Sequence, residues 1–308
     1  GFRLYGNLNQ SLGRPKAVTW VQLLGLACKI PLSIVLTFDW GAGLGVLGCA
    51  LATLIVNWLM AAFATLALLR GDYGTLHLWK RMEPPNARKL GDMLKLGLPN
   101  AGSITVEVTS YTLMALLISR LGSTAAASHQ IMSNMGALLY MVPLSLSIAT
   151  SARVSYWIGA GQPPKARLAI RHGLGWIVTC MAVTASLLAL FKTPIARLYI
   201  ENEVVVEMAS QLLGWLVWYQ SVDALQVFFF FMLRCYRVTI WPMLIYAVLL
   251  WGVGLTGGYT LAYHGLLGSP ALLSPQAFWI SSSTALTVVS ASLGVLLAWV
   301  LRTKARGH

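Results

Sequence analysis

The chain has 308 residues, of which 57% are hydrophobic and only 10% are charged, and its mean hydropathy is +0.70. Soluble domains carry about 25% charged residues, so this composition excludes an ordinary soluble globule and places the chain in the membrane class. The net charge of +13 requires either a polyanionic partner or an asymmetric placement of basic residues along the chain.

Eight apolar segments are long enough to cross a bilayer as helices, which takes about 20 residues each. Several contain glycine or proline, which membrane helices tolerate when neighbouring helices satisfy the freed backbone groups. Because the period-2 alternation of barrel strands is absent, we expect an all-α polytopic membrane protein. In chain order the predicted spans are 17–38, 45–69, 93–119, 123–150, 168–191, 207–233, 240–263 and 276–301.

The basic residues alternate between the two sides of these spans. Eighteen of the 22 lysines and arginines lie in the two tails and in every second loop, whereas the other loops hold only Arg120, Lys192 and Arg197. Basic loops remain in the cytoplasm, so we expect both termini there, in a bacterial-type inner (plasma) membrane. This placement accounts for the net charge, and with no basic soluble domain we expect no nucleic-acid partner.

The longest connection, 70–95, contains Pro84 and Pro85, which break any helix through it. We interpret it as a linker between a two-helix piece, 1–92, and a six-helix piece, 93–308. The hairpins at 4–69 and 233–301 share a weak pattern that is either an internal repeat, as in many transporters, or chance. The four cysteines lack metal or redox spacing, and we expect neither a disulfide nor a cofactor.

Three formal charges lie deep within the predicted spans, at Lys29, Glu107 and Asp223. A charge at the bilayer centre costs about 2.5–3.5 kcal/mol on insertion scales, so such groups face the protein interior or a wet cavity. Helical spacing places Tyr219 and Gln226 on the face of Asp223. Other polar residues lie at similar spacing, namely Gln220 beside Asp223, and Ser103, Ser110 and Tyr111 beside Glu107.

Two carboxylates on different helices, together with hydroxyl and amide oxygens, form a donor set that suits a hard cation such as Na⁺. The same pair can hold a proton, since burial and like-charge proximity disfavour the charged form. The alternative is a static, hydrogen-bonded pair that joins two helices. Lys29 has three interpretations, as a residue that lines a cavity, pairs with a carboxylate or extends to the membrane interface.

A further polar group lies in "ASHQIMSN", where His129 and Ser133 share one helical face and Gln130 and Asn134 share another. Gln130 and Asn134 are candidates for lining a substrate cavity together with Lys29, Gln220 and Gln226. The alternative is that they form hydrogen bonds between packed spans. A histidine metal site is disfavoured, because no second histidine follows at i+4.

Several motifs in the same order resemble the multidrug and toxic compound extrusion (MATE) family, and its NorM-like branch in particular. They are "GLPNAGSITVEV", "AAASHQI", "YMVPLSLSIATSARVSYWIGAGQPPKAR", "YQSVDALQ" and "LRCYRVTIWPM". The resemblance implies twelve helices in two six-helix lobes around a drug-binding cleft. The chain would then begin at the end of the fourth helix, supply the last two helices of the first lobe and contain the whole second lobe. The missing Met agrees with a fragment.

The resemblance also implies that Glu107, Asp223 and Tyr219 bind the coupling cation. Two motifs depart from the family pattern. The segment "KIPLS" has Lys29 and Ser33 where the family often has asparagine, and a lysine near the cleft would disfavour cationic cargo. The turn "RCYRV" has Cys235 and Val238 where the family usually has glycine and aspartate.

We therefore expect a monomeric antiporter that exports amphipathic, cationic drugs or toxic metabolites in exchange for Na⁺ or H⁺. The alternative is a lipid-linked oligosaccharide flippase of the same superfamily, which would need a large cationic cavity. An enzyme is disfavoured because no catalytic motif is present. The expected partners are small-molecule cargo, the coupling cation and the lipid bilayer.

Overall fold

The computed structural model describes residues 2–12, 15–38, 41, 43–69, 86–265 and 270–303. The regular structure in these ranges is entirely helical, and eight of its helices are long and apolar enough to cross a membrane. The predicted all-α polytopic fold and its eight spans are confirmed. Most of the proposed linker, residues 70–85 with both prolines, lies outside the described residues, as do the last basic residues of the C-terminal tail.

The chain forms two compact units, Gly1–Asn86 and Ala87–His308. The first contains α1 (Phe2–Ser11), α2 (Pro15–Thr37) and α3 (Val46–Leu69). Helix α1 was not predicted, because it is too short and polar to span a bilayer. Its Tyr5 is buried against Val18 and Ala64, which joins it to the two spans. Whether the two units correspond to parts of two transporter lobes stays a prediction.

The second unit contains the other six spans. Five are continuous helices, and one is divided into three consecutive segments. In chain order they are α4 (Ala87–Ser119), α5 (Ser123–Gly159), α6 (Pro163–Tyr199), α7 (Glu203–Cys235), the segmented span of α8 (Ile240–Tyr246), η2 (Ala247–Thr256) and α9 (Gly257–Tyr263), and α10 (Pro275–Thr303).

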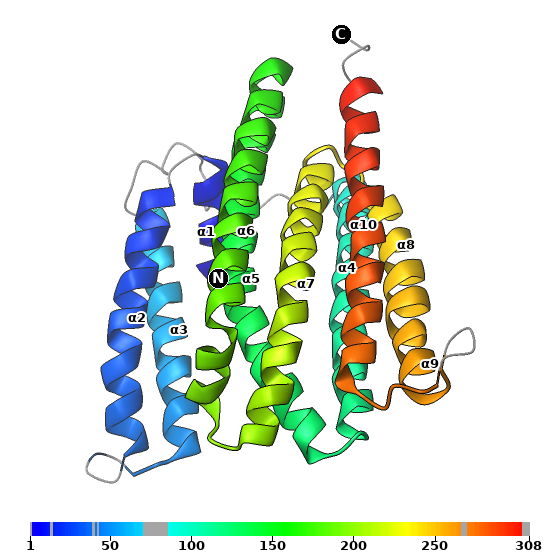
Figure 1. The fold of residues 1–308 in the computed structure, drawn as a ribbon. Helices are drawn as coiled ribbons and strands as arrows, with labels where there is room; N and C mark the ends of the chain where they lie inside the picture. The colour runs from blue at the N-terminus through cyan, green and yellow to red at the C-terminus, as the bar shows by residue number, and fades with distance from the viewer. Residues whose placement is uncertain are drawn as a thin grey trace. The chain divides into compact units, whose positions relative to one another are not determined.

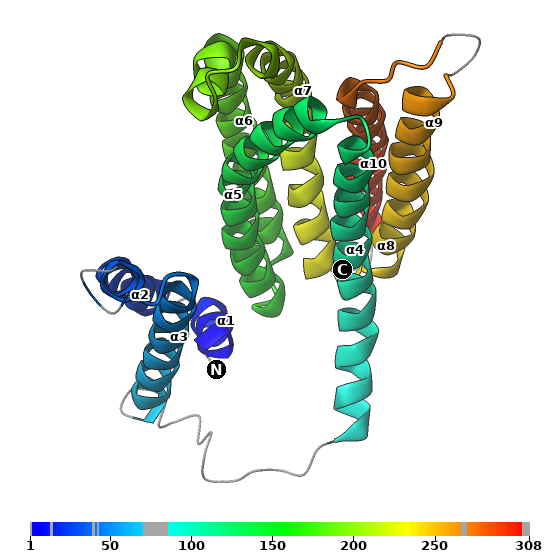
Figure 2. The same cartoon turned by 90° about the horizontal axis from the view of Figure 1, so that it is seen from below.

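Several of these helices are longer than the sequence indicated. Helices α5 and α6 have 37 residues each, a length of about 55 Å at 1.5 Å per residue, whereas the hydrocarbon core is about 30 Å thick. The first turns of α4 likewise extend beyond the rest of the second unit (Figure 2). The apolar runs mark the part of each helix within the hydrocarbon, and the polar, basic ends continue as helix beyond it.

Helix α7 is the centre of the second unit. It lies between α6 and α10 and packs against both of them and against α5 (Figure 1). Its most apolar stretch is 56% buried, more than that of any other span in the described chain. Asn202 caps the start of the helix, because its side chain accepts hydrogen bonds from the backbone N–H groups of Val204 and Val205. An N-cap of this kind satisfies donors that the first turn leaves free.

The seventh span contains a ten-residue π-helix, η2, that the sequence did not indicate. Two hydroxyl groups from neighbouring helices donate to its carbonyl groups. Ser281 of α10 donates to Val253 at 2.7 Å, and Ser110 of α4 donates to Leu250 at 3.4 Å. Short π-helical segments are frequently found at functional sites, and this one packs directly on α4.

Two apolar cores lie one after the other along the second unit. The first includes Val154, Phe228 and Leu293, and the second includes Leu212 and Trp279. The side chain of Tyr219 packs against both cores. The segment of α7 around Tyr219 therefore lies at the boundary between them, and the polar residues of the candidate site are found there.

Candidate cation site

Asp223 lies on α7 between the two apolar cores, and only 5% of it is exposed. The nearby Gln220 and Gln226 on the same helix are buried as well. A buried carboxylate and two buried amides cost free energy unless each finds a polar partner. This polar band of α7 therefore requires groups from other helices, or a ligand, to offset the cost of burial.

Glu107 lies on α4, two turns after Pro99, and is half-buried. The two nearby serines use their hydroxyl hydrogens on the backbone. Ser103 donates to the carbonyl oxygen of Pro99 at 3.1 Å, and Ser110 donates to that of Leu250 in η2. Their oxygens retain only lone pairs toward the carboxylate, so they can assist a bound cation but do not donate to Glu107.

Glu107 and Asp223 lie in the same part of the second unit, since their chain neighbours Val106 and Ala224 belong to one apolar core. The two acids lie on helices without extensive mutual packing, because α4 packs mainly on α5, α8 and η2. Within the described residues, neither carboxylate accepts a hydrogen bond or forms an ion pair. Two like charges of this kind repel each other in a low dielectric, and a shared cation or proton removes the repulsion.

Four tyrosines from four helices experience the charge of one or both carboxylates. They are Tyr111 of α4, Tyr140 of α5, Tyr219 of α7 and Tyr246 of α8. The predicted association of Tyr219 with the two acids is thus matched by three further phenols. Phenolic oxygens are acceptors as well as donors, so they can complete the coordination of a small cation or stabilise a protonated acid.

Gln226 and Tyr246 form a fully buried pair at the edge of this group. The Nε2 of Gln226 donates to the hydroxyl oxygen of Tyr246, while its Oε1 is buried and has no hydrogen-bond partner. An unpartnered buried acceptor is unusual, because nearly all such atoms in proteins are satisfied. The free carbonyl oxygen adds a third acceptor residue to the two carboxylates.

The hard-cation site stays a prediction, and the donors near Asp223 have the chemistry that such a site needs. Glu107, Asp223, Gln226 and the tyrosines offer only oxygen, which suits Na⁺ and does not suit a soft metal. No cluster of three or more His, Cys, Asp or Glu side chains occurs in the described part of the chain. The same oxygen-rich arrangement can hold a proton.

An aromatic group extends from Tyr219 toward the start of α5. The ring of Tyr219 packs edge-on against Trp279 of α10 at 5.0 Å, and Trp279 lies 5.5 Å from the ring of His129. His129 is near Ser133 at 3.3 Å, as the shared helical face predicted. Tyr111 completes the group, with its ring centre 6.1 Å from that of His129 and 6.2 Å from that of Trp279.

The remaining candidate residues are distributed differently. Gln220 is buried beside Asp223, whereas Gln130 and Asn134 are exposed on α5. Gln130 donates to Asn134 at 3.3 Å, a hydrogen bond within one helix rather than between spans. Lys29 is exposed on α2 of the first unit. Their roles in lining a cavity stay predictions.

Sequence reasoning missed Tyr140, Tyr246 and Trp279. Each lies in an apolar run on a helix without a formal charge nearby, where an aromatic residue is read as core or lipid-facing surface. No spacing connects them to Asp223, because they approach it only when the helices pack. Abundant tyrosine within predicted spans was the one signal in the sequence that could have suggested them.

These features define an integral membrane protein of the MATE transporter fold. The chain has a TM-score of 0.84 to "Crystal structure of eukaryotic MATE transporter AtDTX14", at 20% identity over 98% of this chain and 67% of that one. It has a TM-score of 0.87 to "Outward-facing conformation of a multidrug resistance MATE family transporter of the MOP superfamily", at 15% identity over 99% and 66%.

The MatE family model matches residues 99–260, which include Glu107 and Asp223, and the chain belongs to this family. A relative named "Probable multidrug resistance protein NorM" from Aromatoleum aromaticum is 37% identical over 99% of the chain and 65% of its own length. "Multidrug resistance protein NorM" from Vibrio vulnificus is 33% identical over 98% and 66%. The chain thus spans about two thirds of the length of these relatives.

Proposed function

We propose that the protein acts as a cation-coupled antiporter that exports small amphipathic molecules across the membrane, with Na⁺ or H⁺ moving in the opposite direction. The observation that carries this proposal is that Asp223 is buried on α7 without an ion-pair partner among the described residues, in the part of the second unit that also contains Glu107. The names of the NorM relatives support drugs as the exported class. Transport, rather than catalysis, agrees with a site built only of potential cation ligands.

The proposed mechanism depends on the difference in net charge between the empty site and the site with a bound cation. Without a bound cation the two carboxylates repel each other, and this repulsion is strong because the apolar cores on either side screen it poorly. A cation shared by Glu107 and Asp223 removes the repulsion and favours a conformation in which α4 and α7 approach each other. A ligand shifts such an equilibrium only through its different affinity for the two conformations, and the cation supplies that difference here.

Coupling follows if the cation-loaded conformation of the second unit binds cargo weakly. The cation then enters along its gradient, and cargo is released toward the other side. A charge that moves through 100 mV supplies about 2.3 kcal/mol, equivalent to about a 50-fold concentration ratio. We further propose that the protein lies in a bacterial-type inner (plasma) membrane with both termini in the cytoplasm.

The test compares drug efflux from cells that express the protein with Glu107→Gln or Asp223→Asn. Each substitution removes the charge and keeps the shape, so we expect cation-dependent efflux to fall at least about 10-fold at unchanged expression. The matched control is Glu207→Gln, which changes an exposed acid on α7 and should leave efflux at the level of the unsubstituted protein.

Varying the external Na⁺ concentration and the pH separates the two coupling ions, since only the ion that is bound drives efflux. Efflux that changes with neither the Na⁺ gradient nor the pH gradient would contradict antiport. Scrambling of a lipid-linked sugar in the absence of drug efflux would favour the flippase alternative.

A further inference from the structure

Three helix ends of the second unit meet at the end of the bundle where α10 terminates. Arg167 in the first turns of α6 donates from Nη2 to the carbonyl oxygen of Leu301, in the last turn of α10, at 3.1 Å. Arg167 also interacts electrostatically with Tyr236, in the turn between α7 and α8. The start of α6, the end of α10 and the α7–α8 turn are therefore adjacent.

Three arginines belong to the residues that meet at this junction or follow them directly, and a fourth, Arg234, lies in the last turn of α7. Arg237 follows Tyr236 in the turn, Arg302 follows Leu301 on α10, and both are exposed, as is Arg167. Helices α6, α8 and α10 contain no acidic residue, and the last acid of α7 is Asp223, twelve residues before its end. None of these elements supplies a carboxylate to neutralise the three arginines, and the only carboxylates on α4, which packs on α8, are Asp92 and Glu107.

The backbone at Arg237 closes the end of α7, where the N–H of Arg237 donates to the carbonyl oxygen of Arg234 and the N–H of Val238 donates to that of Leu233. Arg237 has a φ of 60°, a left-handed conformation that glycine adopts readily and other residues avoid. Strain of this kind persists where the surroundings or a function require the residue. Arginine at a position that suits glycine therefore costs some free energy of folding.

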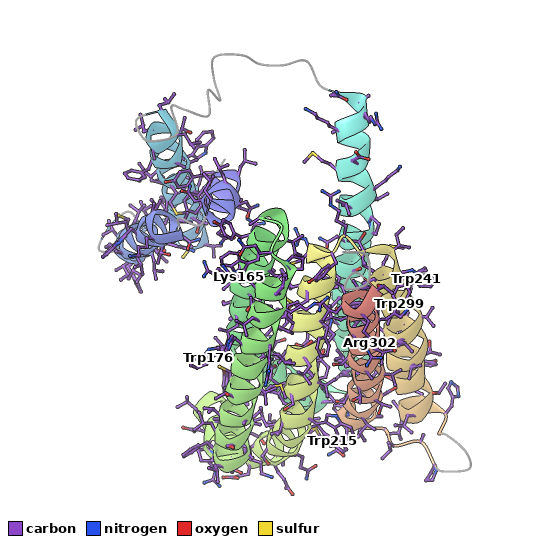
Figure 3. All side chains as sticks on the ribbon, turned by 90° about the horizontal axis from the view of Figure 1, so that it is seen from above. Lys165, Trp176, Trp215, Trp241, Trp299 and Arg302 are labelled. Carbon is purple, nitrogen blue, oxygen red and sulfur yellow. The ribbon has the colours of Figure 1, made fainter. Side chains whose placement is uncertain are left out.

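The surface beside the three arginines is apolar and carries two exposed tryptophans. Trp241 in the first turn of α8 is 62% exposed and Trp299 near the end of α10 is 61% exposed, and these two helices are adjacent (Figure 3). Exposed apolar residues continue along the same two spans away from this end, with Leu244 on α8, Val248 on η2 and Val295 on α10. Tryptophan at such a position marks the membrane–water interface.

We propose that Arg167, Arg237 and Arg302, referred to below as the arginine triad, bind the phosphate headgroup of an anionic phospholipid. Its acyl chains lie against the apolar surface below Trp241 and Trp299. Arginine is suited to phosphate because its planar N–H groups match two phosphate oxygens at once. A lipid is favoured over a free phosphate because the apolar surface continues directly from the triad, and basic pockets between membrane helices are known to bind anionic headgroups.

The test measures lipid binding to the purified full chain by native mass spectrometry. The probes are dioleoyl phosphatidylglycerol, dioleoyl phosphatidylcholine and inorganic phosphate. We expect retention of phosphatidylglycerol but not phosphatidylcholine. Since each basic residue near an anionic headgroup contributes about five-fold, the Arg167→Gln/Arg237→Gln/Arg302→Gln variant should bind about 100-fold more weakly. The Arg120→Gln/Lys192→Gln/Arg197→Gln variant removes the same charge at the other end and should bind normally.

A second variant separates binding from folding, because Arg167 also holds the end of α10. Arg237→Gly removes one guanidinium and relieves the left-handed strain, so it should raise the melting temperature or leave it unchanged while weakening phosphatidylglycerol binding about five-fold. Unchanged phosphatidylglycerol binding in Arg237→Gly and in the triple variant would overturn the proposal. Displacement of the lipid by millimolar inorganic phosphate would overturn the assignment to a phospholipid.

Discussion

At the scale of single residues, Asp223 and Glu107 were predictable because a carboxylate in an apolar span is costly enough to require an interior position. What the sequence did not indicate is the set of phenols around them. Tyr140 and Tyr246 interact with the acids only through helix packing, and periodicity along one helix carries no information about a residue on another. A single chain therefore reveals the charged centre of such a site more readily than its neutral surroundings.

The buried pair of Gln226 and Tyr246 gives a residue-scale prediction. Tyr246→Phe removes the hydroxyl that accepts the hydrogen bond from Gln226 and leaves a buried N–H without a partner. The loss of such a partner costs about 1–3 kcal/mol, so we expect a lower melting temperature in thermal unfolding of the purified chain. The control is Tyr259→Phe, which changes an exposed residue and should shift stability by less than about 0.5 kcal/mol. Equal stability of the two variants would show that the hydrogen bond contributes nothing.

At the scale of elements, the apolar pattern located every span but not the ends of the helices or the π-helical segment. Hydropathy reports which residues lie in hydrocarbon, and the basic extensions of α5 and α6 lie outside it. Segment η2 contains apolar residues and glycine throughout, a composition that suits an α-helix or a π-helix equally. Its wider turn is stabilised by Ser110 and Ser281 from other helices, and these contacts are absent from the local sequence.

Two glycines of the segmented seventh span give a prediction at the scale of elements, because alanine should have opposite effects on stability at the two positions. A Cβ at Gly258 would lie 2.7 Å from Cδ1 of Phe278 and 3.2 Å from its Cα, whereas a Cβ at Gly252 would have no neighbour within 4 Å. Gly258→Ala should therefore destabilise the chain by about 1–3 kcal/mol through overpacking. Gly252→Ala should be neutral or stabilising by up to about 1 kcal/mol, because alanine favours a helix over glycine. Thermal unfolding of both variants checks the contrast, and equal destabilisation would contradict the close packing of α9 on α10.

At the scale of the whole molecule, the alternation of basic and apolar segments predicted the class of protein and the number of spans, and the MatE family relationship agrees with both. Polar residues between two apolar cores place the acid pair inside the second unit, where surface water screens the two charges poorly. The same charge pattern that orients the chain also leaves one end of the unit rich in arginine. The proposed orientation and the proposed lipid binding thus depend on a shared property, the uneven distribution of basic residues.

Membrane orientation gives a prediction for the molecule as a whole. The turn before α5 and the turn before α6 lie at opposite ends of α5, and the positive-inside rule assigns the second, with Lys165 and Arg167 nearby, to the cytoplasm. Ser123, the first residue of α5, and Gln162, in the turn before α6, are both exposed. In intact cells, a membrane-impermeant maleimide should label Ser123→Cys and should label Gln162→Cys only after the membrane is permeabilised. The unsubstituted chain provides the background from its own cysteines, and the reverse labelling pattern would invert the orientation and place the arginine triad at the outer face.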